Sequence, residues 1–168
     1  MSLCGWLMRP FFYAMLRDFL EAGYSVQWKY LKSQDYGVPQ SRERIILIAA
    51  WYLPFILVHS SPGQPMPDFP PPTHGSPPLP PHVCLADAIS NISVNDTLHN
   101  PRPFPVPRWS SIDPSKVFPG TIKASSNSER IYPDGTRFFT MRELARCQSF
   151  SDDHVFGETC VERQSMVI

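Results

Sequence analysis

Gln40, Arg42 and Arg44 form the first group of residues in this sequence that could do chemistry. A guanidinium group presents a planar set of donors that suits phosphates and the edges of bases. If the segment enters a strand, Arg42 and Arg44 project to the same side, because side chains alternate along a strand. The other interpretation is a pair of solvated arginines on a strand edge with Glu43 between them, and the spacing alone favours it.

The second group lies about a hundred residues later and has charged side chains at helical spacing. Thr140 is followed three residues on by Glu143, the pattern of a capping box, which predicts a helix from this point to about Gln148. Arg142, Glu143 and Arg146 could form a network of ion pairs on that helix. Because charge pairs on a helix usually form a solvated face, we predict an architectural role for this group.

The composition describes an ordinary domain without a global charge. The 168 residues include 15 basic and 15 acidic side chains, and 42% are hydrophobic. That content supports a folded core and argues against disorder of the whole chain. Eleven arginines stand against four lysines, which gives weak support for recognition of phosphates or bases.

The apolar run at residues 45–58 is the candidate membrane segment of the sequence. It has 14 residues and contains Pro54, whereas a spanning helix needs about 20. A buried strand with an apolar continuation is favoured. No membrane partner is therefore expected, and residues 1–10 show no signal peptide.

The cysteines and histidines give no sign of a metal site. His74, His82 and Cys84 match no common zinc spacing, and no Cys-x-x-Cys pair occurs among the four widely separated cysteines, Cys4, Cys84, Cys147 and Cys160. Neither a metal nor a disulfide framework is expected, and this usage fits a reducing compartment. Cys147 falls inside the predicted helix, where we expect a buried apolar residue rather than a nucleophile.

Helix, strand, turn and strand are predicted on the N-terminal side. Residues 11–22 have apolar side chains at helical spacing and are followed by Gly23, a natural helix stop. Residues 25–31 alternate between apolar and polar, and residues 44–50 form an apolar run typical of a strand. A turn at residues 36–39 joins them.

The middle of the chain is predicted to be largely irregular. Ten of the twenty residues at 62–81 are proline, so this stretch should be extended and without ladder hydrogen bonds. Residues 85–92 are expected to form a short helix, which is implied by the family resemblance described below. Trp28, Trp51 and Trp109 are expected to anchor the core or loops rather than to stack on bases.

The two charged groups, in this order, resemble two signature blocks of the DNA (cytosine-5) methyltransferases. Residues 36–44 resemble the Gln-x-Arg-x-Arg block, and residues 137–150 resemble the Arg-x-x-Thr-x-Arg-Glu-x-Ala-Arg-x-Gln-x-Phe block. The resemblance implies an α/β fold: the edge of a Rossmann-like class I methyltransferase fold, plus a small, irregular, β-containing and Pro-rich target-recognition region.

The same resemblance implies three parts of the chain. Residues 1–50 would be the C-terminal edge of the methyltransferase catalytic domain, and residues 51–136 the Pro-rich target-recognition region. Residues 137–168 would be the return helix and the truncated end of the catalytic domain. Whether residues 51–61 are an insertion stays open.

The resemblance also implies roles for the first group. Arg44 would reach the target cytosine oxygen and Arg42 the DNA backbone, with Gln40 as the third DNA-binding residue. The reaction moves a methyl group from S-adenosylmethionine to carbon 5 of a flipped-out cytosine, and it needs a thiolate, an acid and a cofactor loop. No nucleophile block, acid block or Gly-rich cofactor loop is found in this sequence. We therefore expect a fragment that is inactive alone and needs DNA and the missing N-terminal half.

Two other functions are open. The chain could be a non-catalytic DNA-binding or regulatory remnant of such an enzyme, with binding that depends on salt. A proline-rich adaptor is less favoured, because no basic residue flanks the prolines between Ser61 and His82. We expect a nuclear location in a eukaryote and a cytoplasmic one otherwise. The apolar strand at residues 45–48 predicts poor solubility of the chain by itself.

Overall fold

The computed structural model describes residues 9–51, 66–122 and 130–156, with the side chain of residue 51 left out. Cys4, Cys160 and the apolar run beyond residue 51 lie outside the described residues. The chain divides into two compact units. The first unit combines Met1–Leu31 with Arg44–Pro71, and the second combines Lys32–Glu43 with Pro72–Ile168.

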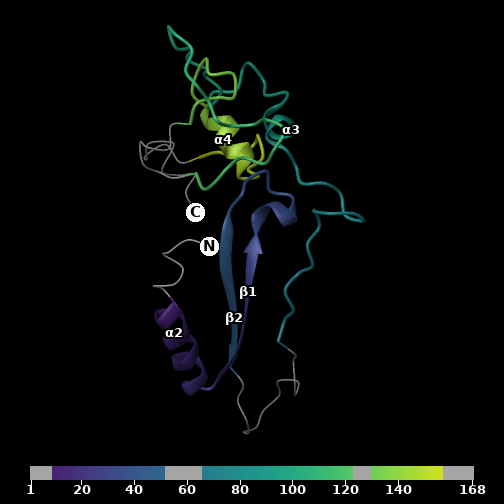
Figure 1. Ribbon diagram of the computed structural model, residues 1–168, viewed down its shortest axis with the longest axis vertical. Helices are drawn as coiled ribbons and strands as arrows, with labels where there is room; N and C mark the ends of the chain where they lie inside the picture. Colours follow the sequence, from purple (N-terminus) through teal and green to yellow (C-terminus); the bar gives the residue numbers. More distant parts are fainter. Residues whose placement is uncertain (1–8, 52–65, 123–129, 157–168) are drawn as a thin grey trace. The chain divides into compact units, whose positions relative to one another are not determined.

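Among the residues that the structure describes, the first unit contains helix α2 and most of a two-stranded sheet (Figure 1). Helix α2 spans Arg9–Glu21, and Gly23, with a φ of 85°, ends it. Strands β1 (Tyr24–Lys32) and β2 (Glu43–Trp51) pair in an antiparallel hairpin. The predicted order of helix, strand, turn and strand is thus confirmed, with each strand one residue longer at both ends.

Helix α2 lies against the hairpin through aromatic rings. Phe12 packs edge-on against Trp28 of β1, with ring centroids 5.1 Å apart, and Phe19 does the same against Tyr24 at 5.7 Å. Edge-to-face pairs of this kind add about 0.5–1.5 kcal/mol each beyond the area they bury. Trp28 is therefore an anchor, as predicted.

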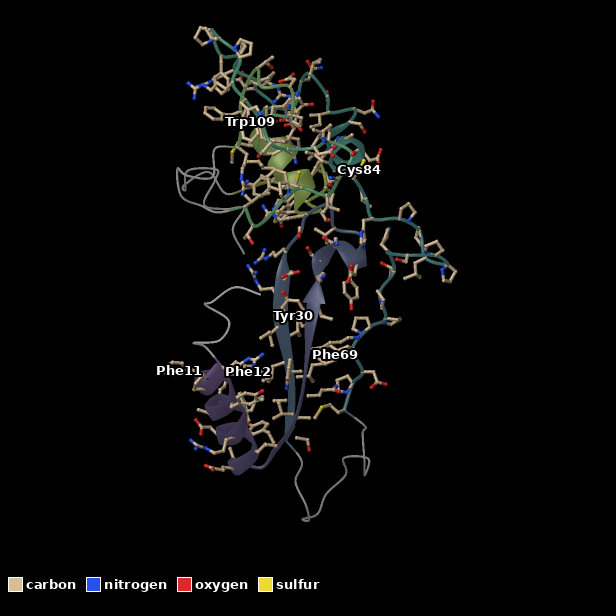
Figure 2. The ribbon with its side chains drawn as sticks, in the orientation of Figure 1. Phe11, Phe12, Tyr30, Phe69, Cys84 and Trp109 are labelled. Atoms are coloured by element: carbon tan, nitrogen blue, oxygen red, sulfur yellow. The ribbon has the colours of Figure 1, made fainter. Side chains whose placement is uncertain are left out.

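The faces of this unit that point away from those contacts are apolar and exposed. No residue of α2 is buried, and Phe11 is 70% exposed. In Figure 2, Phe11 lies on the side of α2 that faces away from the hairpin. Large exposed side chains continue along the helix and both strands: Tyr13, Met15, Leu20, Trp28, Tyr30, Ile45 and Ile46. Contiguous apolar surface of this extent on a two-stranded sheet is typical of a surface that another element covers.

We expect the chain by itself to bind a hydrophobic dye and to scatter light at micromolar concentration. Changing Phe11 and Leu20 together to Ser should lower both signals without loss of helix, because both side chains point to solvent. Dye fluorescence, light scattering and circular dichroism measure this. The matched control is Val155→Ser, at an equally exposed apolar position of the second unit. Low dye binding by the unmodified chain would contradict the expectation.

The second unit has a core of its own. Eight hydrophobic side chains are buried together: Leu85, Ile112, Phe118, Ile122, Phe139, Leu144, Ala145 and Cys147. They come from helix α3 (Leu85–Ile89), from helix α4 (Met141–Cys147) and from irregular segments between them. Phe150 packs on the edge of this cluster, and Ala145 is fully buried.

Two expectations for this unit are wrong. The helix predicted at 85–92 stops at Ile89, because Ser90 turns to an extended conformation and Asn91 takes a positive φ of 55°. Trp109 is not an anchor, since it is 82% exposed and makes no ring contact with any described residue.

None of the described helices is both long and apolar enough to cross a membrane. Over the same residues, no three His, Cys, Asp or Glu side chains gather in a way that could hold a metal ion.

Candidate nucleic-acid interface

The backbone around Gln40 is fixed by a short parallel pairing with Phe118. The N–H of Ser41 donates to the carbonyl of Phe118 at 2.8 Å, and the N–H of Phe118 donates to the carbonyl of Pro39 at 2.9 Å. Phe118 is fully buried in the core of the second unit. The segment that leads to Arg42 is therefore attached to the best-packed part of that unit.

Ser33 braces the same segment from the other side. Its hydroxyl donates to the carbonyl of Gln40 at 2.6 Å and accepts from the N–H of Arg42 at 3.1 Å. The N–H of Ser33 also donates to the carbonyl of Arg42 at 2.9 Å. Ser33 begins the 3-10 helix η1 (Ser33–Tyr36), so this helix and the segment before β2 hold each other in place.

A histidine covers the turn that follows η1. Gly37 has a φ of 83°, and a Cβ atom there would lie 2.8 Å from Cε1 of His74. The N–H groups of Thr73 and His74 both donate to the carbonyl of Asp35, at 2.8 and 3.0 Å. Only glycine suits this turn, because it needs a left-handed backbone and a side chain would strike the imidazole.

The Pro-rich segment therefore has a definite position around residues 72–82. His82 adds a side-chain contact, with Nε2 3.1 Å from Oδ1 of Asp35. Together with the Thr73 and His74 donors, this contact attaches the end of the Pro-rich stretch to η1. His74 and His82 thus hold the loop rather than sit free on its surface.

Gln40 is the most buried of the three predicted site residues. It is 1% exposed, and its Nε2 finds no acceptor among the residues that the structure describes. A buried amide without an acceptor is costly, by about 1–3 kcal/mol. An acceptor outside the described residues would remove that cost.

The two arginines differ in their surroundings. Arg42 is half-buried and directly precedes β2, whereas Arg44 is exposed and lies within that strand. Arg42 belongs to the second unit and Arg44 to the first. Glu43, between them, pairs with Lys32 at 3.7 Å. The alternation of a regular strand thus begins only after Arg42.

The second charged group is buried, which the sequence did not predict. Glu143 is 2% exposed and receives a bidentate pair from Arg137, with N–O distances of 2.9 and 2.7 Å. The Arg137 guanidinium lies 3.7 Å from the centroid of the Tyr132 ring. Burial, followed by the Glu143 carboxylate, raises the pKa of the Tyr132 hydroxyl.

Helix α4 begins with the predicted capping box. The N–H of Thr140 donates to Oε2 of Glu143 at 2.7 Å, and the N–H of Glu143 donates to the Thr140 hydroxyl at 3.3 Å. His99 Nδ1 lies 2.9 Å from the same hydroxyl. Glu143 thus serves both the cap and Arg137, which explains why its carboxylate tolerates burial.

The predicted network within the helix is wrong, because each of its charged side chains pairs outside the helix. Arg142 donates to Asp96 at 2.6 Å and to the carbonyl of Ser151 at 3.1 Å. Arg146 donates to Asp152 at 2.7 Å and also to the carbonyl of Ser90. These arginines attach α4 to the loops before and after it. Their role is architectural, but it depends on contacts outside the helix rather than on pairs within it.

We expect Glu143→Ala to lower the free energy of unfolding by about 3–5 kcal/mol, because it leaves the Arg137 charge buried and unpaired. Thr140→Ala removes the cap alone and should cost about 0.5–2 kcal/mol. Urea unfolding measures both. The control is Lys116→Ala, which breaks an exposed pair with Asp113 and should change little. Equal effects of the Glu143 and Lys116 substitutions would refute the buried pair.

Cys147 lies in the core, as predicted, and not in a reactive setting. Its side chain is fully buried, and burial, with the Glu143 carboxylate acting in the same direction, raises the pKa of the thiol to about 12. A thiol with this pKa stays protonated at neutral pH, and the thiolate is the nucleophilic form. Cys147 is therefore unsuited to attack a base.

Iodoacetamide at pH 8 should label Cys84 well before Cys147 in the folded chain. Cys84 is partly exposed (Figure 2), whereas Cys147 is shielded and protonated. Peptide mass spectrometry gives the rate at each site. Both thiols should react at similar rates in urea, and fast labelling of Cys147 without denaturant would show that the core opens.

The sequence comparisons agree with the resemblance. Residues 8–53 match the family described as C-5 cytosine-specific DNA methylase. The Type II methyltransferase M.BsuRI of Bacillus subtilis is 29% identical over 86% of this chain and 36% of that protein. M.BspRI of Lysinibacillus sphaericus is 27% identical over 88% and 38%, and M.Sau96I of Staphylococcus aureus is 28% identical over 85% and 39%.

This chain thus spans little more than a third of the length of the curated relatives that it matches. The similarity to type II methyltransferases extends over most of the chain, and the family match is confined to α2, the hairpin and the segment that carries Gln40, Arg42 and Arg44.

Proposed function

We propose that this chain is the DNA-contacting C-terminal part of a DNA (cytosine-5) methyltransferase. The observation that carries the proposal is the family match over residues 8–53, which includes the arginine segment that the second unit holds in place. The proposed boundaries are those given above: catalytic edge to residue 50, target-recognition region to 136 and return segment to 168. The hairpin would be the edge of a Rossmann-like sheet.

In this proposal Arg44 contacts the target cytosine and Arg42 a DNA phosphate. Arg44 is exposed on β2, as a contact to a flipped-out base requires. Arg42 has a fixed backbone, because its N–H donates to the Ser33 hydroxyl and its carbonyl accepts from the Ser33 N–H. Gln40 would take part only where an acceptor reaches its buried amide. Pre-positioned donors of this kind lose little freedom when they bind.

S-adenosylmethionine is the methyl donor that the proposal implies, but the described residues do not fit its binding site. They contain no unit of strand, Gly-rich turn and helix, and the turn after β1 leads into η1 instead. We propose that the cofactor site, the nucleophile and the acid belong to a further part of the enzyme. That part would also cover the exposed apolar faces of α2 and the hairpin.

Arg44→Ala should weaken binding of the whole chain to a labelled DNA duplex by about 5- to 150-fold, the loss of one good base contact. Arg42→Ala should flatten the dependence of log affinity on log salt by about 0.9, the loss of one phosphate contact. Fluorescence anisotropy across a potassium chloride series measures both, below the concentration at which the chain scatters light. Arg17→Ala, at an exposed arginine of α2 paired with Asp18, is the control and should change neither.

No binding of the unmodified chain at low salt would overturn the proposal. If it binds, a chimaera separates an enzyme part from a non-catalytic remnant: this chain replaces the segment of M.BsuRI that it matches. Methyl transfer by the chimaera supports the enzyme. DNA binding without methyl transfer favours the remnant.

A further inference from the structure

Residues 101–109 form an irregular segment, here termed the arm, whose backbone is held by hydrogen bonds at two points. Proline occupies every second position from 101 to 107, and each proline fixes its own φ. The N–H of Phe104 donates to the carbonyl of Thr136 at 2.6 Å, and the N–H of Arg108 donates to the carbonyl of Gly135 at 2.7 Å. The arm therefore has one backbone course rather than many.

Gly135 permits this attachment. Its φ is 76°, and a Cβ atom there would lie 2.0 Å from the carbonyl oxygen of Arg108. No other residue type can keep the arm at that distance. On the inner side, Phe104 packs edge-on against Phe138 at 4.7 Å. The Arg108 guanidinium stays exposed and lies 4.4 Å from the Phe104 ring centroid.

The packing of the second unit does not account for the exposed side chains on the outer side of the arm. Trp109 is 82% exposed, and neither it nor Arg102 has a hydrogen bond, ion pair or ring partner among the described residues. Val106 and Arg108 are exposed beside them. A rigid backbone that presents an indole to water gains nothing in stability from that side chain, so the exposure points to a ligand.

The charges on and around the arm indicate which kind of ligand it suits. The arm carries two guanidinium groups and no carboxylate. On the facing turn, Asp134 is occupied by Thr136, which holds the pKa of that carboxyl below its usual range, and Arg137 is paired with Glu143. Flat aromatic rings and guanidinium groups together are the means by which proteins hold unstacked bases and their phosphates.

We propose that the arm is a DNA-contacting element in which Trp109 stacks on a base displaced from the duplex, while Arg102 and Arg108 meet the flanking phosphates. This rests on the proposed function, since it assumes that DNA is the partner. It adds a second contact region, distant in sequence from Arg42 and Arg44, and it assigns the exposed tryptophan a purpose. The fixed backbone means that little freedom is lost on binding.

The test compares two labelled duplexes, one fully paired and one with an abasic site that leaves the opposite base unpaired. Trp109→Ala in the whole chain should weaken binding to the second duplex by about 5- to 150-fold, the range for loss of one stacked base, and binding to the first by less. Trp109→Phe should retain most of the affinity, because it keeps an aromatic face. Val94→Ala is the matched control at a side chain that is 88% exposed.

Three further measurements make the result specific. The melting temperature of the Trp109→Ala chain should equal that of the unmodified chain, because the indole has no hydrogen-bond or ring partner among the described residues. Gly135→Ala should weaken binding as well, although every exposed side chain of the arm is kept. Arg102→Ala should reduce the salt slope by about 0.9.

The outcomes separate the two proposals. If the unmodified chain binds DNA and Trp109→Ala binds both duplexes equally well, the arm is not a DNA contact and the proposed function stands. If the unmodified chain binds neither duplex, both proposals fall. If Trp109→Ala instead abolishes self-association in sedimentation experiments and leaves DNA binding unchanged, the arm is a protein-docking element and the inference is overturned.

Discussion

Glu143 carries a negative charge where water hardly reaches it, and the second unit is arranged around the need to neutralise that charge. Its two oxygens are taken by the fork of Arg137 and by the N–H of Thr140. Removing any one of these groups would strand another in a medium of low dielectric constant. These contacts fix the start of α4 relative to the segment around Arg137 and to the Tyr132 ring.

The loops of the second unit are attached to α4, the helix that begins at this ion pair. Arg142 and Arg146 reach out of α4 to Asp96, Ser90, Ser151 and Asp152. These contacts let a region with little regular structure keep a definite shape, because charge-assisted hydrogen bonds replace the ladders that a sheet would provide. At η1, neutral backbone hydrogen bonds have the same effect, since the carbonyl of Asp35 accepts from the N–H groups of both Thr73 and His74.

The two units differ in how much of their own apolar surface they bury. The second has a buried cluster that includes Phe118, and Phe118 also fixes the backbone beside Gln40. The first buries no residue of α2 and leaves large apolar side chains open on the helix and the hairpin. A sheet of two strands cannot bury both faces. This contrast accords with a chain of which one part folds around its own core and the other completes a larger sheet.

The sequence by itself determined the elements whose signals are local. The apolar periodicity of residues 11–22, the alternation of residues 25–31 and the Thr140–Glu143 capping box each need only a few neighbouring residues. All three predicted the right element, with ends that differ by one or two residues in α2 and β1. The family resemblance of the segment around Gln40 was also recognisable from residue order alone, and the family match covers that segment. Tertiary structure decided the rest, because it depends on partners distant in the chain. Arg142 pairs with Asp96 rather than with a neighbour on its helix, Gln40 is buried where its backbone pairs with Phe118, and Gly135 holds the arm through the backbone of Arg108. No spacing rule specifies contacts between residues 27 to 78 positions apart, since such contacts follow from how the loops pack.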